Sequence, residues 1–240
     1  MKLLKLLYRR DTAAPIYALT FASVAGAALV LTRVLWTHNL RYGFLVWNLL
    51  LAWLPLVFAM LARELDQRGE RRNWRFVSLA AAWLLFFPNA PYIFTDVVHL
   101  LYSFSQHFWV DLSLILLFAL TGLVLGFVSL YFMQAVVARM LGRVTGWLFV
   151  AGVAGLGSFG AYLGRFLRFN SWDVLAKPLA LYRGIGTSVV NPGQHSSGIA
   201  FIALFATFLF LAYVMLYALT HLPKPLPLEQ TTRTPQAASA

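Results

Sequence analysis

The strongest constraint in this sequence is a series of apolar segments that approach or exceed the length needed to cross a membrane. A spanning helix needs about 20 predominantly apolar residues, because the hydrocarbon core is about 30 Å thick. Six segments fit, at residues 14–35, 42–62, 76–94, 109–136, 146–163 and 198–220. The alternating pattern of an outer-membrane barrel is not found in the sequence. The sequence therefore predicts an all-α fold, a polytopic transmembrane bundle of about six helices.

Composition supports a membrane protein and excludes some chemistry. Of the 240 residues, 60% are hydrophobic and only 11% are charged, outside the usual balance of soluble domains. The sequence has no cysteine, which excludes disulfides, thiolate catalysis and cysteine-ligated metals. The sequence assigns no cofactor.

The distribution of basic residues predicts the orientation of the bundle. Lysine and arginine are scattered through short loops rather than gathered into one basic domain, which argues against a nucleic-acid partner. Thirteen of the nineteen lie on the side of the two predicted termini and six on the other. Because cytoplasmic loops carry an excess of these residues, we expect both termini in the cytoplasm and the chain in a bacterial inner (plasma) membrane. The partners implied are the lipid bilayer and an anionic lipid or lipid-linked substrate, and protein partners are not predicted.

Three regions follow from this pattern. Residues 1–13 form a cytoplasmic N-terminus, 14–220 the transmembrane helical domain, and 221–240 a tail predicted to be disordered because it is rich in proline and small polar residues. Residues 174–190 are apolar but are interrupted by Lys177, Pro178 and Arg183. We interpret them as an interfacial or re-entrant piece.

A first polar cluster interrupts the third predicted helix, in the stretch LLFFPNAPYIFTDVVHL at residues 84–100. Pro88 and Pro91 remove backbone donors and disfavour helical geometry at the preceding residue, so the helix is expected to break there. Asn89 is placed to cap a second half-helix. On that half-helix one stripe carries Tyr92, Thr95 or Asp96, and His99. A simple proline kink explains the break equally well; the clustered polar residues favour a site.

A second polar cluster ends the fifth predicted helix, in GSFGAYLGRFLRFNSWD at residues 157–173. Arg165 and Arg168 lie one turn apart, followed by Asn170 and Asp173. Snorkelling at the membrane boundary would explain one arginine, whereas paired guanidinium groups suit bidentate binding of phosphate or carboxylate. Helix rise places Arg165 and Asp96 at nearly the same depth, which predicts that Asp96 lies near Arg165 or Arg168.

Weaker candidates surround these clusters. His107 and Asp111 are spaced as metal ligands on one helix face, but Asp111 begins a predicted span, where an acid stabilises the helix dipole, and we assign it that role. No spacing in the sequence matches a specific zinc motif, and no metal site is assigned. Two glycine pairs fit close helix packing, namely Gly122 with Gly126 and Gly160 with Gly164.

At FPNAPYIFTDVVHL and GRFLRFNSWD the sequence resembles a family of bacterial multi-pass membrane proteins that is known only as a domain of unknown function. The resemblance covers about residues 40–220. It implies the helical architecture and supports the idea that the two clusters act together. It implies no activity, so whether the protein is an enzyme is left open.

Three classes of function stay open. In an enzyme, Asp96 or His99 would act as acid or base on a phosphate-bearing lipid or lipid-linked substrate at the extracytoplasmic face. In a transporter or lipid-binding protein, the broken third helix would provide the binding site, and Arg165 and Arg168 would select an anionic cargo. In an accessory subunit, both clusters would only lock helices together. The candidate ligand-binding residues in the first two classes are Asn89, Tyr92, Thr95, Arg165, Arg168, Asn170 and Asp173.

Overall fold

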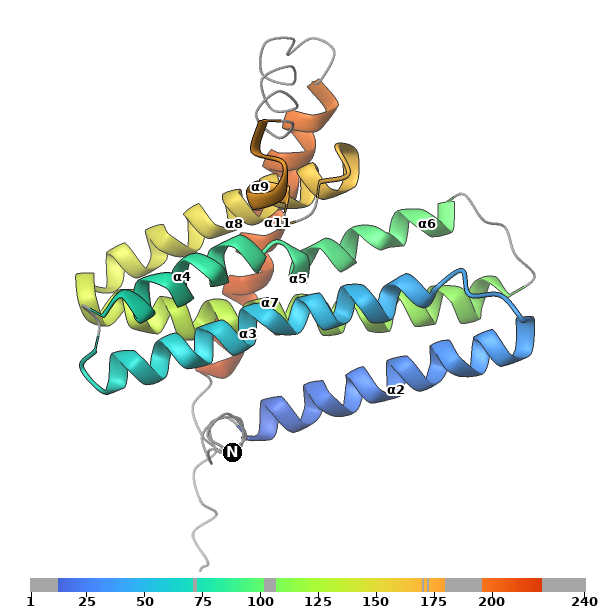
Figure 1. Cartoon of the computed structure of the whole chain (residues 1–240), viewed down its shortest axis with the longest axis horizontal. Helices are drawn as coiled ribbons and strands as arrows, with labels where there is room; N and C mark the ends of the chain where they lie inside the picture. Colours follow the sequence, from blue (N-terminus) through green and yellow to red (C-terminus); the bar gives the residue numbers. More distant parts are fainter. Residues whose placement is uncertain are drawn as a thin grey trace, which may run out of the picture.

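The computed structural model describes residues 13–70, 73–101, 107–169, 171, 173–179 and 196–221. Within this part every regular element is a helix (Figure 1). The elements are α2 (Ala13–Thr37), α3 (Gly43–Gln67), α4 (Trp74–Phe86), α5 (Asn89–Tyr92), the 3₁₀ helix η1 (Ile93–Val97), α6 (Val98–Leu101), α7 (Phe108–Leu141), α8 (Arg143–Phe166), α9 (Asp173–Ala176) and α11 (Ser196–Thr220). The tail after residue 221 and most of residues 174–190 lie outside the described part.

The prediction of about six helical spans is confirmed. Six stretches of the described chain are long and apolar enough to cross a membrane, and each overlaps one of the predicted segments. The third stretch, Trp74–Leu100, comprises α4, α5, η1 and α6, which follow one path across the bundle in Figure 1. The chain is therefore an all-α, multi-pass membrane protein.

The predicted loss of helical geometry before Pro88 is not what the structure shows. The α-helical pattern is interrupted between Phe86 and Asn89, yet Phe87 (φ −52°, ψ −42°) and Pro88 (φ −58°, ψ −24°) keep right-handed helical dihedrals. The Phe87 amide still donates to the carbonyl of Trp83, at 2.8 Å. Pro88 and Pro91 cannot donate backbone hydrogen bonds, and a tightened turn and the 3₁₀ segment η1 accommodate this loss. The span therefore bends without opening into extended backbone.

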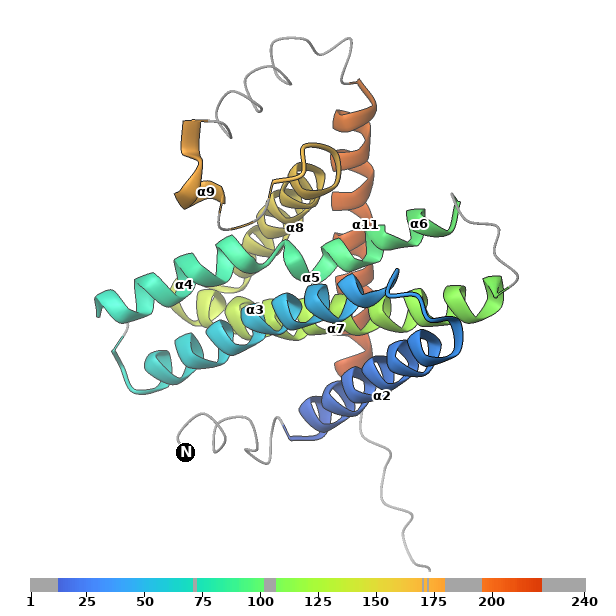
Figure 2. The same cartoon turned by 45° about the vertical axis from the view of Figure 1, so that its right-hand side comes forward.

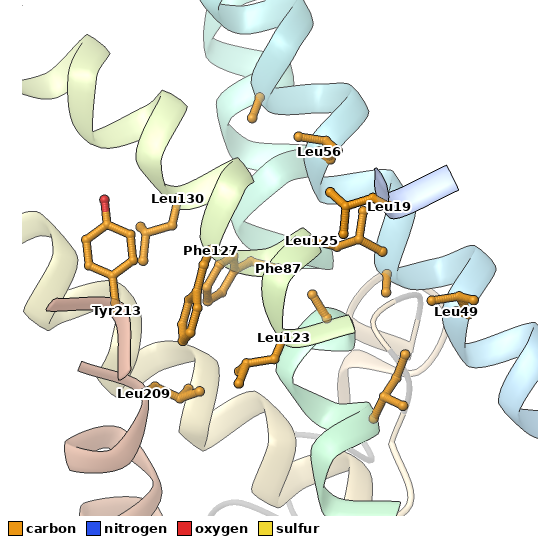
Figure 3. Close-up of a cluster of buried hydrophobic side chains, with 14 of the residues drawn as sticks. Leu19, Leu49, Leu56, Phe87, Leu123, Leu125, Phe127, Leu130, Leu209 and Tyr213 are labelled. Atoms are coloured by element: carbon orange, nitrogen blue, oxygen red, sulfur yellow. The ribbon is translucent and has the colours of Figure 1, made fainter. Parts of the chain in front are cut away.

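Helix α7 is the centre of the bundle. Of its most apolar stretch 61% is buried, against at most 39% in any other span. Figure 3 shows Leu123, Leu125, Phe127 and Leu130 of α7 among buried side chains from its neighbours, which include Leu49 and Leu56 of α3, Phe87, and Leu209 and Tyr213 of α11. Helix α7 therefore carries the contacts that hold the other spans together.

Helices α7 and α8 are joined by a single residue, Gly142. Its φ of +95° lies in a region that residues with a side chain rarely adopt, and its amide closes α7 by donating to the Ala138 carbonyl at 3.0 Å. The chain thus reverses within one residue. Helix α8 packs back along α7, and α11 packs on α8.

Helix α11 runs in a different direction from the central helices. In Figures 1 and 2 it is steeply inclined to α3 and α7. Its length and composition suit a membrane span, but a steep crossing does not by itself fix the side on which it ends. The expectation that both termini lie on one side stays a prediction.

Glycines on α7 and α8 allow both helices to pack closely against α5 and the residue before it. A Cβ on Gly122 of α7 would lie 2.9 Å from the Ala90 carbonyl oxygen, and one on Gly160 of α8 would lie 2.5 Å from Cγ of Pro88. On the same two helices, Gly126 faces Ala90, and Gly164 faces Tyr92. Both predicted glycine pairs therefore serve close packing, and both pack against one segment. This contact brings the first polar cluster against the end of α8.

Candidate functional site

Arg165, in the last turn of α8, is the hub of the polar residues at this end of the bundle. Its guanidinium forms an ion pair with Asp96 of η1 and donates from Nε and Nη2 to Oγ1 of Thr95, at 3.0 and 2.8 Å. The Asp96 side chain is 1% exposed. The predicted contact between Asp96 and Arg165 is confirmed. A carboxylate so buried requires this cation, because an unpaired charge would cost several kcal/mol.

Tyr92 and His99 complete the contacts of Arg165. The guanidinium carbon lies 4.8 Å from the centre of the Tyr92 ring, a cation–π arrangement, and Nη1 lies 3.5 Å from Nδ1 of His99. Tyr92, Thr95, Asp96 and His99 thus face one arginine, as expected for residues on one stripe. Arg165 and these four residues come from the two clusters that the sequence singled out.

Asn48 of α3 belongs to the same network and was missed in the sequence. Its amide Nδ2 donates to the second carboxylate oxygen of Asp96, at 3.1 Å. The available signal was a lone asparagine within the apolar stretch GFLVWNLLLAWL. In membrane helices such isolated polar residues often hydrogen-bond across a helix interface. The hydropathy pattern alone could not say which helix α3 would face.

A pocket of about 580 Å³ lies beside this network, between α3, α4, α5 and α8. Its apolar wall is built mainly from Leu51, Leu84, Leu85, Leu156, Phe159 and Leu163. Its polar groups are Asn48, Asn89, Tyr92, Arg168 and Ser171. Leu84 and Leu156 are also exposed on the outer surface, so the pocket reaches the lipid-facing side between α4 and α8. Both sequence clusters therefore contribute to one pocket.

Comparison with known families identifies the chain. A family model described as a protein of unknown function (DUF1361) matches residues 47–214, well over half of the 240 residues. The chain belongs to this family. The matched range includes both polar clusters and every residue that lines the pocket. No curated protein and no solved structure matches the chain.

In this DUF1361 protein the Asn89 side chain forms a hydrogen bond with Ser171 instead of capping a helix. Helix α5 begins at Asn89 itself, without a side-chain cap, and Nδ2 of Asn89 donates to Oγ of Ser171 at 3.0 Å. The predicted capping role is therefore wrong. The physical reason is that the chain never leaves helical geometry at Pro88, so no new helix N-terminus needs a cap. Asn89 instead ties the two polar clusters together at the pocket.

Arg168 has an unusual backbone and side chain. Its φ is +57°, in the left-handed region where glycine is preferred after a helix C-terminus. The following amide, of Phe169, donates to the Leu163 carbonyl at 3.1 Å and closes the turn. Arg168 lines the pocket, and among the described residues its guanidinium has no hydrogen-bond or ion-pair partner. It is the cation at this site that is available to a ligand.

The remaining predicted residues lie elsewhere. Asp173 begins α9, is buried, and has Lys177 Nζ 3.9 Å from its carboxylate. Asn170 lies outside the described residues. Across the described ranges no group of three or more His, Cys, Asp and Glu side chains could hold a metal ion.

Asp111 takes part in a second buried ion pair. It lies in the first turn of α7, as the dipole argument predicted, and also binds Arg33 of α2, with Nε 2.6 Å from Oδ1. The Tyr42 hydroxyl donates to Oδ2 of Asp111, at 3.1 Å. Burial raises the pKa of Tyr42, and the Asp111 carboxylate raises it further, so the tyrosine keeps its proton and remains a donor.

A third ion pair lies at the other end of α3 and α7. Asp66 of α3 is 3% exposed and binds Arg139 in the last turn of α7. Like Asp96 and Asp111, it is a buried carboxylate paired with an arginine from another helix. In the sequence Arg33 and Arg139 appear only as charges that set the topology; their carboxylate partners become visible when the helices pack.

Proposed function

We propose that this membrane protein binds a lipid or lipid-linked molecule that carries a phosphate or similar anionic headgroup. The observation that carries the proposal is the pocket itself. It joins an apolar wall that reaches the lipid-facing surface to an arginine without a described partner. Such a combination suits an amphipathic anion better than a small soluble ion, because the apolar wall gains free energy only by covering a hydrocarbon chain.

The position of Arg168 supports a headgroup ligand. Helix α8 ends at Phe166, so Arg168 lies just beyond the end of an apolar span. Lipid headgroups lie at that depth, next to the hydrocarbon core. An arginine there, with its planar fork of donors, is well suited to phosphate oxygens.

Arg165 has a different role in this proposal. Sequence reasoning gave both arginines to the anion, but Arg165 is already bound to Asp96 and Thr95, and it does not line the pocket. We therefore assign the anionic group to Arg168. Arg165 holds the wall in place through Tyr92, which lies against its guanidinium and also lines the pocket.

Binding is better supported than acid–base catalysis. Asp96 is engaged by Arg165 and Asn48, and neither Asp96 nor His99 lines the pocket. A general base must come within hydrogen-bond reach of the proton that it takes. The transporter and lipid-binding class is therefore preferred to the enzyme class, and Asn89, Tyr92 and Ser171 are proposed as ligand contacts beside Arg168.

We further propose that the pocket faces the extracytoplasmic side of a bacterial inner membrane. The excess of basic residues on the side of the two predicted termini supports this orientation. Arg168 follows α8 at the end opposite to Arg143, on the side with fewer basic residues. The ligand would then be a lipid of the outer leaflet.

Native mass spectrometry of detergent-purified protein tests the proposal. We expect a phosphatidic acid adduct that Arg168→Gln weakens about tenfold, the value of a typical charge-assisted contact. Arg143→Gln is the matched control, because it removes an exposed arginine at the other end of the same helix. Glycerol phosphate without acyl chains should bind much more weakly. Equal binding by both variants and the wild type would overturn the proposal, and equal binding of glycerol phosphate would point to a free phosphate ligand.

A further inference from the structure

The hydrogen bonds behind the pocket wall constrain the chemistry of the headgroup. Asn48 lines the pocket and at the same time donates from Nδ2 to Oδ2 of Asp96, at 3.1 Å. Asp96 forms an ion pair with Arg165, and the carboxylate of an ion pair can only accept hydrogen bonds. The Asn48 amide therefore has one possible orientation, with its nitrogen toward Asp96. This step does not depend on the identity of any ligand.

The orientation decides what Asn48 offers to the pocket. With Nδ2 held by Asp96, the free groups are the carbonyl Oδ1 and one amide hydrogen. No described residue donates to this carbonyl. An ionised phosphate has only acceptor oxygens and would leave Oδ1 unpaired, whereas a hydroxyl can donate to Oδ1 and accept from the amide.

Asn89 offers a similar group at the same pocket. Its Nδ2 donates to Oγ of Ser171, at 3.0 Å, so its carbonyl Oδ1 is also without a described donor. The polar part of the pocket thus combines one arginine, Arg168, with two amide carbonyls. An anion satisfies the arginine, and hydrogen-bond donors on the same ligand satisfy the carbonyls.

We infer that the ligand is an anionic lipid whose headgroup carries hydroxyl groups beside the phosphate, a polyol phosphodiester. This inference rests on the proposed function and specifies its substrate class. Hydroxyls are preferred to an ammonium as the donors, because Arg168 at the same pocket repels a second cation. Asn48 is then a specificity-determining residue, positioned by Asp96 and Arg165.

Competition between matched lipids tests the inference on the wild-type protein. Phosphatidylglycerol and phosphatidylethanol carry the same single negative charge, but only the first has headgroup hydroxyls. With equal acyl chains in native mass spectrometry, we expect phosphatidylglycerol to bind at least about threefold more tightly, the contribution of one or two hydrogen bonds. Equal binding, or tighter binding of phosphatidylethanolamine, would overturn the inference. If both anionic lipids still depend on Arg168, the proposed function survives that result; if neither does, both fail.

The variant Asn48→Ala assigns the preference to one residue. We expect it to weaken phosphatidylglycerol binding more than phosphatidylethanol binding, so that the preference between the two lipids shrinks. The second lipid serves as the internal control, because general damage to the pocket would weaken both. A variant that keeps the full preference for phosphatidylglycerol would exclude Asn48 as its cause and overturn this assignment.

Discussion

Arg168 occupies a backbone position that glycine usually takes. A left-handed residue with a Cβ costs about 1–2 kcal/mol in backbone strain. His38, in the turn between α2 and α3, has a similar φ of +49°. The strain at Arg168 places a guanidinium without a described partner at the pocket, whereas His38 does not line this pocket. We interpret the strained arginine as a functional feature.

Replacing Arg168 with glycine separates stability from binding. We expect Arg168→Gly to raise the thermal unfolding midpoint in detergent, because about 1–2 kcal/mol of backbone strain is relieved. The same variant should lose most of its affinity for phosphatidic acid. His38→Gly is the control, with a gain in stability and unchanged binding. Loss of both stability and binding in Arg168→Gly would identify the arginine as a structural residue.

The pair of Asp96 and Arg165 should behave as a unit. Removing one partner of a buried ion pair leaves an uncompensated charge and costs about 3–5 kcal/mol. We therefore expect Arg165→Leu to lower the unfolding midpoint strongly, and Arg165→Leu combined with Asp96→Leu to recover part of the loss. The measurement is a double-mutant cycle of unfolding free energies. Additive effects would mean that the two charges do not stabilise each other.

At the scale of elements, the site depends on how closely α5 approaches α7 and α8. Glycines remove the side chains that would hold these helices apart, and Pro88 and Tyr92 fill the space over Gly160 and Gly164. Pro88 thus fits the packing surface of α8, and Pro91 faces Gly126 of α7. Because α5 leads directly into η1, this packing fixes Asp96 opposite Arg165.

Two alanine substitutions on α8 test this packing. At Gly160 a new Cβ would lie 2.5 Å from Pro88 Cγ, so Gly160→Ala should destabilise the protein by about 1–3 kcal/mol, typical of overpacking. At Gly152 nothing lies within 4 Å of the added Cβ, and Gly152→Ala should stabilise the helix by about 0.5–1 kcal/mol. The test compares unfolding midpoints of the two variants. Equal shifts would show that α5 does not depend on the glycine surface.

For the whole molecule, ion pairs on buried carboxylates join the helices at both ends of the bundle. Arg33 with Asp111 and Arg165 with Asp96 lie at one end, and Arg139 with Asp66 at the other. Since α7 contributes to two of these pairs and has the most buried span, it is the element on which the other helices are organised. The exposed surface is left apolar, as lipid requires.

The orientation of the bundle is testable in cells. Positive-inside bias predicts that a reporter fused after Ala240 is cytoplasmic and that a tag inserted near Ser103 is accessible from outside. The measurement is labelling of the tag with a membrane-impermeant reagent before and after lysis. Labelling only after lysis would reverse the proposed side of the pocket. A reporter outside the cell would mean that α11 does not return the chain as a sixth span.

The sequence by itself determined the fold class, the number of spans and the two polar clusters. These properties depend on local hydropathy and on residue spacing along single helices, which are visible without knowing any neighbour. The pairing of Asp96 with Arg165 could also be predicted, because helix rise fixes depth and buried opposite charges pair. Only the tertiary structure decided which face of each helix meets another. It placed Asn48 beside Asp96 and paired Arg33 with Asp111. It also paired Arg165 with Asp96 while leaving Arg168 without a described partner. Finally, it kept Pro88 in helical geometry. The physical reason is that these outcomes depend on helix rotation and close packing between distant segments, and an apolar pattern in lipid does not encode rotation.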